Sequence, residues 1–156
     1  NTILNSFYGI YLEGVDSCVI RNNKISGKAE RESTSGNAIH AWNSKNSLIE
    51  NNQLSGHRDG IYLEFVENSL MKDNYSHSNL RYGLHFMFSN NDAYIGNTFR
   101  NNGAGVAVIV VRPVCNGAQC SAGTEALRFG EQRQGGDGPR QQLRDPGAGQ
   151  AVRVQG

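Results

Sequence analysis

The sequence predicts an all-β protein, a right-handed parallel β-helix with about 22 residues in each coil. A motif of the form Gly-apolar-X-apolar-X recurs, with copies that start at residues 9, 60, 83 and 105 and a degenerate copy that starts at Ala38. A second marker keeps step with it, at Asn23, Asn52, Asn74 and Asn97. The rest of each repeat is short, strand-like and rich in Asn and Ser, without a 3.6-residue period. A regular internal repeat of this length is typical of a solenoid, whose coils stack on one another.

Each repeat is expected to contain two or three short strands. The first strand covers Ile10–Leu12, Ile39–Ala41, Ile61–Leu63, Leu84–Phe86 and Val106–Val108. After a polar turn, a second apolar run follows at Val19-Ile20, Leu48-Ile49, Leu70-Met71 and Ala93-Tyr94-Ile95. The Asn marker then ends the run, and Ile25, Leu54 or Phe99 follows two residues later. Asn suits this position because it tolerates left-handed backbone and because stacked amides can form a ladder.

The period alone leaves two solenoids open. The second half of each repeat overlaps the leucine-rich-repeat pattern, but that fold requires a Leu-rich helical return, which is missing here. The β-helix is therefore the favoured interpretation. One interval between copies is 29 residues rather than 22 or 23, and the charged stretch at residues 28–35 is expected to form a loop there.

We expect two regions with a boundary near residue 109. Residues 1–109 carry the repeats and begin in the middle of one, so the sequence is interpreted as a fragment with an incomplete β-helix domain. Residues 110–156 are rich in Gly, Arg and Gln, and contain all three Pro of the chain. This composition favours a tail that is irregular, disordered or foreign to the fold, for example through a shifted reading frame.

The bulk composition excludes several classes of function. The net charge is +1 without a basic block, so nucleic acid is not an expected partner. There is no apolar run of the roughly 20 residues that a membrane-spanning helix needs. Three Cys do not fit a disulfide framework.

The first strand of each repeat is expected to present a chemically rich outer face. Because successive side chains of a strand point to opposite sides, Ile61 and Leu63 should face the core. The alternate residues of each first strand should point outward and stack from coil to coil into two columns. One column is Tyr11, His40, Tyr62 and His85, and the other is Glu13, Trp42, Glu64 and Met87. Part of this pattern has a simpler explanation, since Tyr and Trp are common on exposed strands and stack on each other.

The outer face suggests a copper site. His85 and Met87 are two residues apart on one strand, and Glu64 should lie beside Met87. Imidazole with thioether suits copper, above all Cu(I), because the soft sulfur selects it. Zn²⁺ would prefer Cys, His or carboxylate. His40 should lie two coils from His85, about 10 Å away, too far to share one ion.

The turns before the strands offer a weaker cluster. His57 and His77 lie near one rim of the predicted coils and form a second candidate metal site. Asp59 and Arg81 are expected at neighbouring rim positions, where an exposed ion pair would contribute about 0–1 kcal/mol.

Two other functions compete with metal binding. Glu13 and Glu64 should flank Trp42 at a separation of about 10 Å. An inverting glycosidase holds its carboxyl groups about 6.5–9.5 Å apart. A polysaccharide-acting hydrolase or lyase is thus an alternative, although no further Asp cluster, catalytic triad or phosphate loop supports it. A structural solenoid that only presents a protein-docking surface is a third interpretation.

Three runs within residues 1–109 are long and specific, namely GNAIHAWNSKNSLIENNQLSGHRDGIYLEFVENS, NLRYGLHFMFSNND and NTFRNNGAGVAV. In these runs the sequence resembles the NosD family of periplasmic copper-binding proteins. It implies a right-handed β-helix exported to the periplasm, where it would assist the maturation of nitrous-oxide reductase in denitrification. It also implies copper as the bound ion, work with an ABC transporter at the inner membrane, and no catalytic turnover. A copper chaperone is a further partner that this role allows. Family members continue for several coils beyond Val108, where this chain departs from them.

Overall fold

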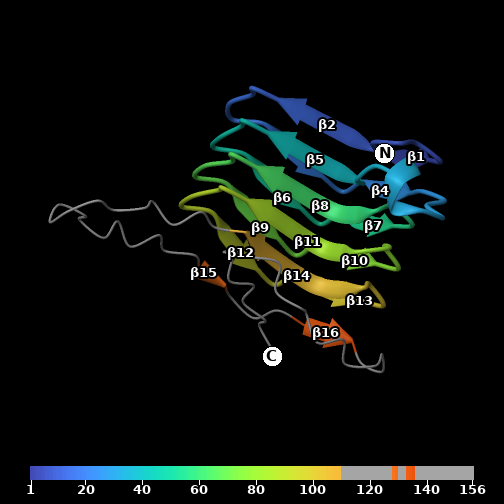
Figure 1. Cartoon of the computed structure of the whole chain (residues 1–156). Helices are drawn as coiled ribbons and strands as arrows, with labels where there is room; N and C mark the ends of the chain where they lie inside the picture. Colours follow the sequence, from blue (N-terminus) through green and yellow to red (C-terminus); the bar gives the residue numbers. More distant parts are fainter. Residues whose placement is uncertain (110–127, 130–132, 136–156) are drawn as a thin grey trace, which may run out of the picture.

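The computed structural model describes residues 1–109, 128–129 and 133–135. Within these residues, the strands form three parallel sheets that run along the molecule (Figure 1). The first sheet contains β1 (Thr2–Leu4), β4 (Lys24–Ser26), β7 (Gln53–Ser55), β10 (Tyr75–His77), β13 (Thr98–Arg100) and β16 (Arg133–Gly135). The second, called the front sheet below, contains β2 (Ile10–Glu13), β5 (Ile39–Trp42), β8 (Asp59–Glu64), β11 (Tyr82–Met87) and β14 (Ala104–Ile109). The third contains β3 (Val19–Arg21), β6 (Leu48–Glu50), β9 (Leu70–Lys72), β12 (Ala93–Ile95) and β15 (Arg128–Phe129).

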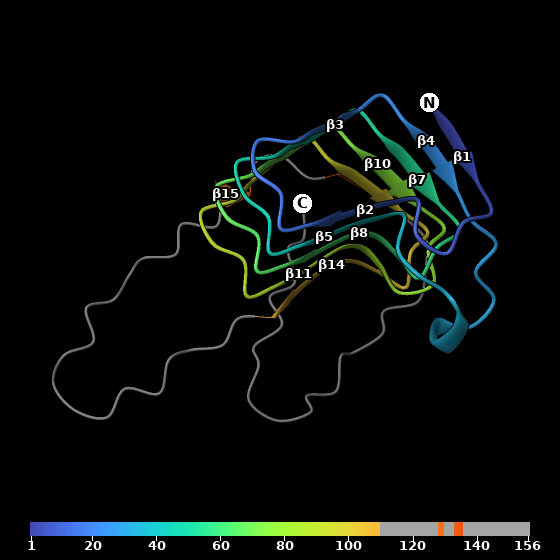
Figure 2. The ribbon, with the colours of Figure 1, turned by 90° about the horizontal axis from the view of Figure 1, so that it is seen from above.

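The chain visits the three sheets in turn and so forms a parallel β-helix, as the repeat predicted. Seen from above, β2, β3 and β4 follow one another clockwise, and the later coils lie successively further down (Figures 1 and 2). This is the right-handed sense that was expected. The register confirms the period, because Ile39 pairs with Ile61, and Leu84 with both Ile61 and Val106.

The core is one continuous stack of apolar side chains inside the coils. Equivalent positions of successive coils lie over each other, for example Ile20, Ile49, Met71 and Tyr94 from the third sheet. These four side chains are buried. Full burial of a side chain of this size contributes about 1.5–3 kcal/mol to stability, so the stack is the main source of folding free energy.

The Asn marker forms the predicted amide ladder. The side-chain oxygen of Asn52 accepts hydrogen bonds from the backbone N–H and the amide of Asn23, at 3.1 and 2.9 Å. In the same way, the side-chain oxygen of Asn74 accepts from the backbone N–H and the amide of Asn52. The side-chain oxygen of Asn97 accepts from the backbone N–H and the amide of Asn74. The ladder therefore satisfies buried backbone groups at each corner and holds neighbouring coils in register.

The charged insert is a connection outside the sheets, as expected, and contains a short 3-10 helix at Glu32–Thr34. The predicted irregular tail lies outside the described residues, apart from β15 and β16. These two short strands pair with β12 and β13.

The front sheet bends where β8 and β11 begin. A Cβ placed on Gly60 would collide with Ser76 Oγ, and one placed on Gly83 with the ring of Phe99. Both glycines thus face the interior, and so do the residues that follow them, Ile61 and Leu84. Two successive residues therefore face the core, and the inward–outward alternation of side chains is broken there. As a result Asp59, which precedes Gly60, lies on the outer side of the sheet near His85.

Candidate metal site

A ladder of aromatic and imidazole rings runs along the outer side of the front sheet. Tyr11, His40, Tyr62 and His85 occupy equivalent positions of four successive strands. Their ring centroids are 4.9, 4.7 and 4.9 Å apart in that order. The predicted column is therefore confirmed in register.

The predicted exposure of this column is wrong at its lower end. Tyr11 is 44% exposed, whereas His85 is only 5% exposed. The side chain of His85 points away from the core, but neighbouring side chains cover it. The ring of Tyr82 lies 4.9 Å from that of His85, and Arg81 Nη2 lies 3.2 Å from His85 Nδ1. The covering residues are Arg81, just before β11, and Tyr82, the first residue of β11.

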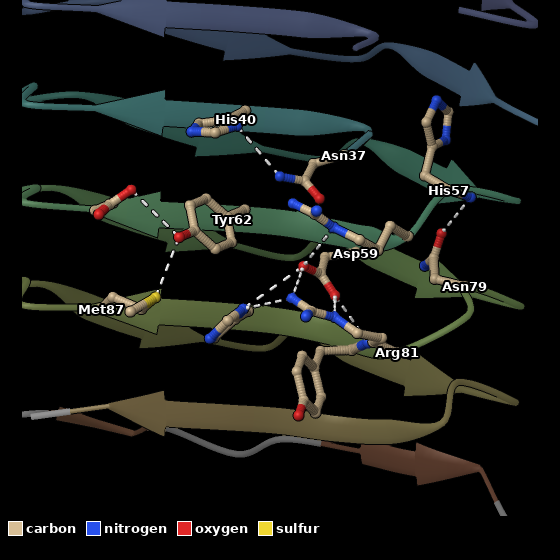
Figure 3. Close-up of polar contacts among 12 residues, drawn as sticks. Asn37, His40, His57, Asp59, Tyr62, Asn79, Arg81 and Met87 are labelled. Atoms are coloured by element: carbon tan, nitrogen blue, oxygen red, sulfur yellow. Dashed lines mark hydrogen bonds and ion pairs between the residues drawn. The ribbon is translucent and has the colours of Figure 1, made fainter. Parts of the chain in front are cut away.

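Asp59 and Arg81 form an ion pair beside His85, in which the carboxylate is buried and the guanidinium side chain is partly exposed (Figure 3). Arg81 donates from Nε to Asp59 Oδ1 at 3.1 Å and from Nη2 to Oδ2 at 2.7 Å. The exposed pair expected from the sequence is corrected here, because the Asp59 side chain is fully buried. Removal of Arg81 would leave the buried Asp59 carboxylate with Arg58 alone, whose Nε lies 3.7 Å from Oδ2, and should therefore destabilise the fold.

The electrostatics of Asp59 favour the ionised form. Burial acts to raise the pKa of its carboxyl group, but hydrogen bonds with His85 and Arg81 outweigh burial and hold the pKa below the ordinary value. The distance from His85 Nδ1 to Asp59 Oδ2 is 3.5 Å. A permanent negative charge thus lies directly behind the imidazole ring.

The hydroxyl group of Tyr62 links the two columns (Figure 3). It lies 3.1 Å from Met87 Sδ and 3.2 Å from Glu64 Oε2. Burial, with the nearby Glu64 carboxylate, raises the pKa of Tyr62 to about 12, so the phenol keeps its proton. That single proton can be donated to the carboxylate or to the sulfur, but not to both at once.

His85 and Met87 supply the donor pair of the candidate site. Within the described residues, His85 Nε2 is buried and has no hydrogen-bond partner. Met87 is half-buried on the same strand, and Tyr62 contacts both His85 and Met87. A neutral imidazole nitrogen and a thioether fit a soft ion of low coordination number, as Cu(I) is. In the described part of the chain no three His, Cys, Asp or Glu come together as a metal cluster.

The other predicted histidines lie apart from His85. His40 is separated from it by the ring of Tyr62, as the two-coil spacing predicted. The amide of Asn37 lies 3.2 Å from His40 Nδ1. Burial, assisted by Arg58, lowers the pKa of His40 to about 4, so its ring is neutral at neutral pH.

His57 and His77 lie in different environments. His57 is buried at a corner, with Nδ1 2.9 Å from the carbonyl oxygen of Ser55. His57 therefore lies in the turn before β8, as expected, and is buried there. His77 is half-buried on β10 and stacks on Tyr75 with 4.5 Å between ring centroids. Burial lowers the pKa of both histidines, so both favour the neutral form.

The second predicted column is confirmed in register. Glu13 pairs with Trp42, Trp42 with Glu64, and Glu64 with Met87. Glu13 and Trp42 are exposed, whereas Glu64 and Met87 are half-buried. The aromatic platform between two carboxylates, on which the carbohydrate interpretation rests, is therefore present.

Sequence reasoning did not assign Tyr82 and Asn37 to the site, and it gave Asp59 and Arg81 only a role in an exposed ion pair. A signal was available in the repeat register. Tyr82 is the equivalent of Asp59 on the next strand, so the residue pairs before Gly60 and Gly83 had to lie side by side.

The fold and the face together define a class, a parallel β-helix protein with imidazole and thioether donors on one sheet. Residues 22–115 match the sequence model of the NosD family, described as periplasmic copper-binding protein. The match covers more than half of the sequence, and the chain belongs to the NosD family. Its localisation is accordingly periplasmic and its family-level property is copper binding. No helix in the described residues is long and apolar enough to cross a membrane. A search of curated proteins found no match.

Proposed function

We propose that this protein holds Cu(I) on its front sheet, with His85 Nε2 and Met87 Sδ as ligands. The proposal is carried by His85 Nε2, which is buried and has no hydrogen-bond partner within the described residues. Met87, which supplies the thioether, is two residues further along the same strand. Glu64 is a candidate for a third ligand, because Tyr62 holds its carboxylate near Met87. His57, His77 and His40 rank lower, since each lies in a separate environment.

The bound copper is cargo in this proposal. A site with only an imidazole and a thioether ligand favours transient binding, because few bonds have to break on release. We propose that the copper is used to assemble the copper centres of nitrous-oxide reductase. The partners would be that reductase, the subunits of an ABC transporter at the inner membrane, and a copper chaperone that loads this protein. The resemblance described above supports this role, and the protein would have no catalytic turnover of its own.

Competition with a chromogenic Cu(I) chelator, under anaerobic reducing conditions, tests the ligand set. The background variant should have Cys18, Cys115 and Cys120 replaced by Ala, because thiolates also bind Cu(I) strongly. His85→Ala and Met87→Leu should each weaken binding by at least tenfold. His77→Ala is the matched control and should leave the affinity within a factor of two. Unchanged binding in both ligand variants would remove this site.

The assembly role needs a separate experiment. Nitrous-oxide reductase is produced in cells that contain this protein, lack it, or contain the His85→Ala variant. The copper content of the purified reductase should fall in the second and third cases. Full copper loading without this protein would refute the assembly role and leave the binding site untouched.

A polysaccharide-acting enzyme is the second candidate, because the register places Trp42 between Glu13 and Glu64. Release of reducing sugar from a polysaccharide, lost in Glu64→Gln, would favour it. A panel of acidic and neutral polysaccharides without any release would exclude it for those substrates.

A further inference from the structure

We propose that Asp59, held by Arg81, is a positioning residue that accepts a hydrogen bond from His85 Nδ1–H and thereby leaves Nε2 free for the metal ion. This inference rests on the proposed function, because it concerns how the same site is prepared. It assigns a role to a carboxylate that does not itself reach the ion.

The hydrogen bonds of Asp59 leave one acceptor position for His85. A carboxylate offers about four acceptor sites, two on each oxygen. Oδ1 accepts from Arg81 Nε at 3.1 Å and from the Tyr82 backbone N–H at 3.2 Å. Oδ2 accepts from Arg81 Nη2 at 2.7 Å. The remaining site on Oδ2 faces His85 Nδ1 at 3.5 Å, whereas Arg58 Nε is further away, at 3.7 Å.

Burial of the far ring nitrogen favours the same arrangement. Arg81 Nη2 lies 3.2 Å from His85 Nδ1, so donation from Arg81 to that nitrogen is the rival geometry. The rival would put the ring proton on Nε2, where the described residues offer no acceptor. A buried donor without a partner costs about 1–3 kcal/mol. With the proton on Nδ1 instead, the group left free is a lone pair, which is what a metal ion requires.

The neighbouring histidine provides a contrast within the same ladder. Asn37 precedes β5 and pairs its amide nitrogen with His40 Nδ1 at 3.2 Å. An amide N–H donates, so His40 carries its proton on Nε2 and cannot ligate through it. An amide in place of the Asp59 carboxylate should have the same effect on His85.

The ring tautomer of His85 gives a direct test that needs no copper. Long-range ¹H–¹⁵N spectra of the uniformly ¹⁵N-labelled full chain, in the background without Cys and at one fixed neutral pH, distinguish the protonated ring nitrogen from the free one. We expect Nδ1–H for His85 and Nε2–H for His40, with His40 as the internal reference. On addition of Ag(I), a redox-inert substitute for Cu(I), the His85 Nε2 resonance should shift while Nδ1 keeps its proton.

Asp59→Asn should move the His85 proton to Nε2 and weaken Ag(I) binding by about 10–100-fold, the range seen when the partner of a ligating histidine is removed. Arg58→Gln is the matched control, because Arg58 faces Asp59 without a hydrogen bond, and it should change neither quantity. Far-UV circular dichroism shows whether each variant is folded. If Asp59→Asn is not folded, the ring tautomer of His85 in the unaltered protein is the deciding measurement.

Two results would overturn the inference, namely an Nε2–H tautomer for His85 in the unaltered protein, or full Ag(I) affinity in a folded Asp59→Asn variant. If His85 has the Nδ1–H tautomer but His85→Ala binds Ag(I) normally, the hydrogen-bond geometry stands and the proposed copper ligand falls. Failure of the two proposals is thus distinguishable.

Discussion

Replacement of Asn74 by Ala should be among the most destabilising single changes in the described part of the chain. The Asn74 side chain takes part in four hydrogen bonds. Its oxygen accepts from the backbone N–H and the amide of Asn52, both at 3.0 Å. Its amide donates to Ile49 O at 2.8 Å and to Asn97 Oδ1 at 2.9 Å. Ala removes all four bonds and leaves their partners in a buried corner.

The size of the effect follows from these contacts. Each net hydrogen bond contributes about 0.5–1.5 kcal/mol, and a buried donor left without an acceptor costs about 1–3 kcal/mol. The amides of Asn52 and Asn97 keep other contacts, namely Ile20 O at 3.0 Å and the Asn74 N–H at 3.0 Å. The Asn52 backbone N–H is the donor that loses its side-chain acceptor. We therefore expect the free energy of unfolding to fall by roughly 3–6 kcal/mol.

Urea unfolding of the full chain at 25 °C, followed by circular dichroism, measures this loss. Asn90→Ala is the matched control, because the Asn90 side chain makes no hydrogen bond within the described residues and should change stability by no more than about 0.5 kcal/mol. Four hydrogen bonds should contribute at least about 2 kcal/mol together, at about 0.5 kcal/mol each. A loss below about 1 kcal/mol for Asn74→Ala would therefore show that the amide ladder does not stabilise the fold as expected.

Three further predictions concern charge and metal uptake. Burial raises the pKa of Asp92 to about 7, so the folded protein binds a proton that the unfolded chain has lost above about pH 4. As the pH rises from about 4 to 7, the unaltered protein should therefore lose stability relative to Asp92→Asn. A difference in urea midpoint between the two proteins that is the same at pH 4.5 and at pH 8 would contradict this. Tyr62→Phe lacks the hydroxyl group at Met87 and Glu64, so Ag(I) should bind several-fold faster in stopped-flow measurements, and an unchanged rate would show that the hydroxyl does not hinder entry. His40→Ala should leave Ag(I) affinity within a factor of two, because Tyr62 separates His40 from His85; a tenfold loss would make His40 a ligand.

The coil-to-coil register followed from sequence because stacked strands repeat every 22–23 residues and the side-chain period is two. Once Ile61 was assigned to the core, Tyr62 had to face outward beside His40 and His85. The amide ladder followed for the same reason, since a residue at a fixed corner position must meet its equivalents above and below.

Burial of His85 did not follow from the sequence, because it depends on side chains beyond the regular strand. The bend at Gly60 and Gly83 breaks the alternation and places Asp59 on the outer side. Arg81 and Tyr82 then cover the imidazole, and the solvent-facing column becomes a closed site at that end. Alternation alone cannot predict such a bend, because it assigns each residue of a strand independently of the sheet's curvature.

X-ray absorption spectroscopy of the Cu(I)-loaded protein, in the background without Cys, identifies the atoms bound to the ion. We expect one sulfur and at least one imidazole nitrogen around the ion in that background. Met87→Leu should lose the sulfur shell, and His85→Ala should lose an imidazole contribution. A first shell without sulfur, or a sulfur shell that persists in Met87→Leu, would contradict the assignment of copper to the front sheet.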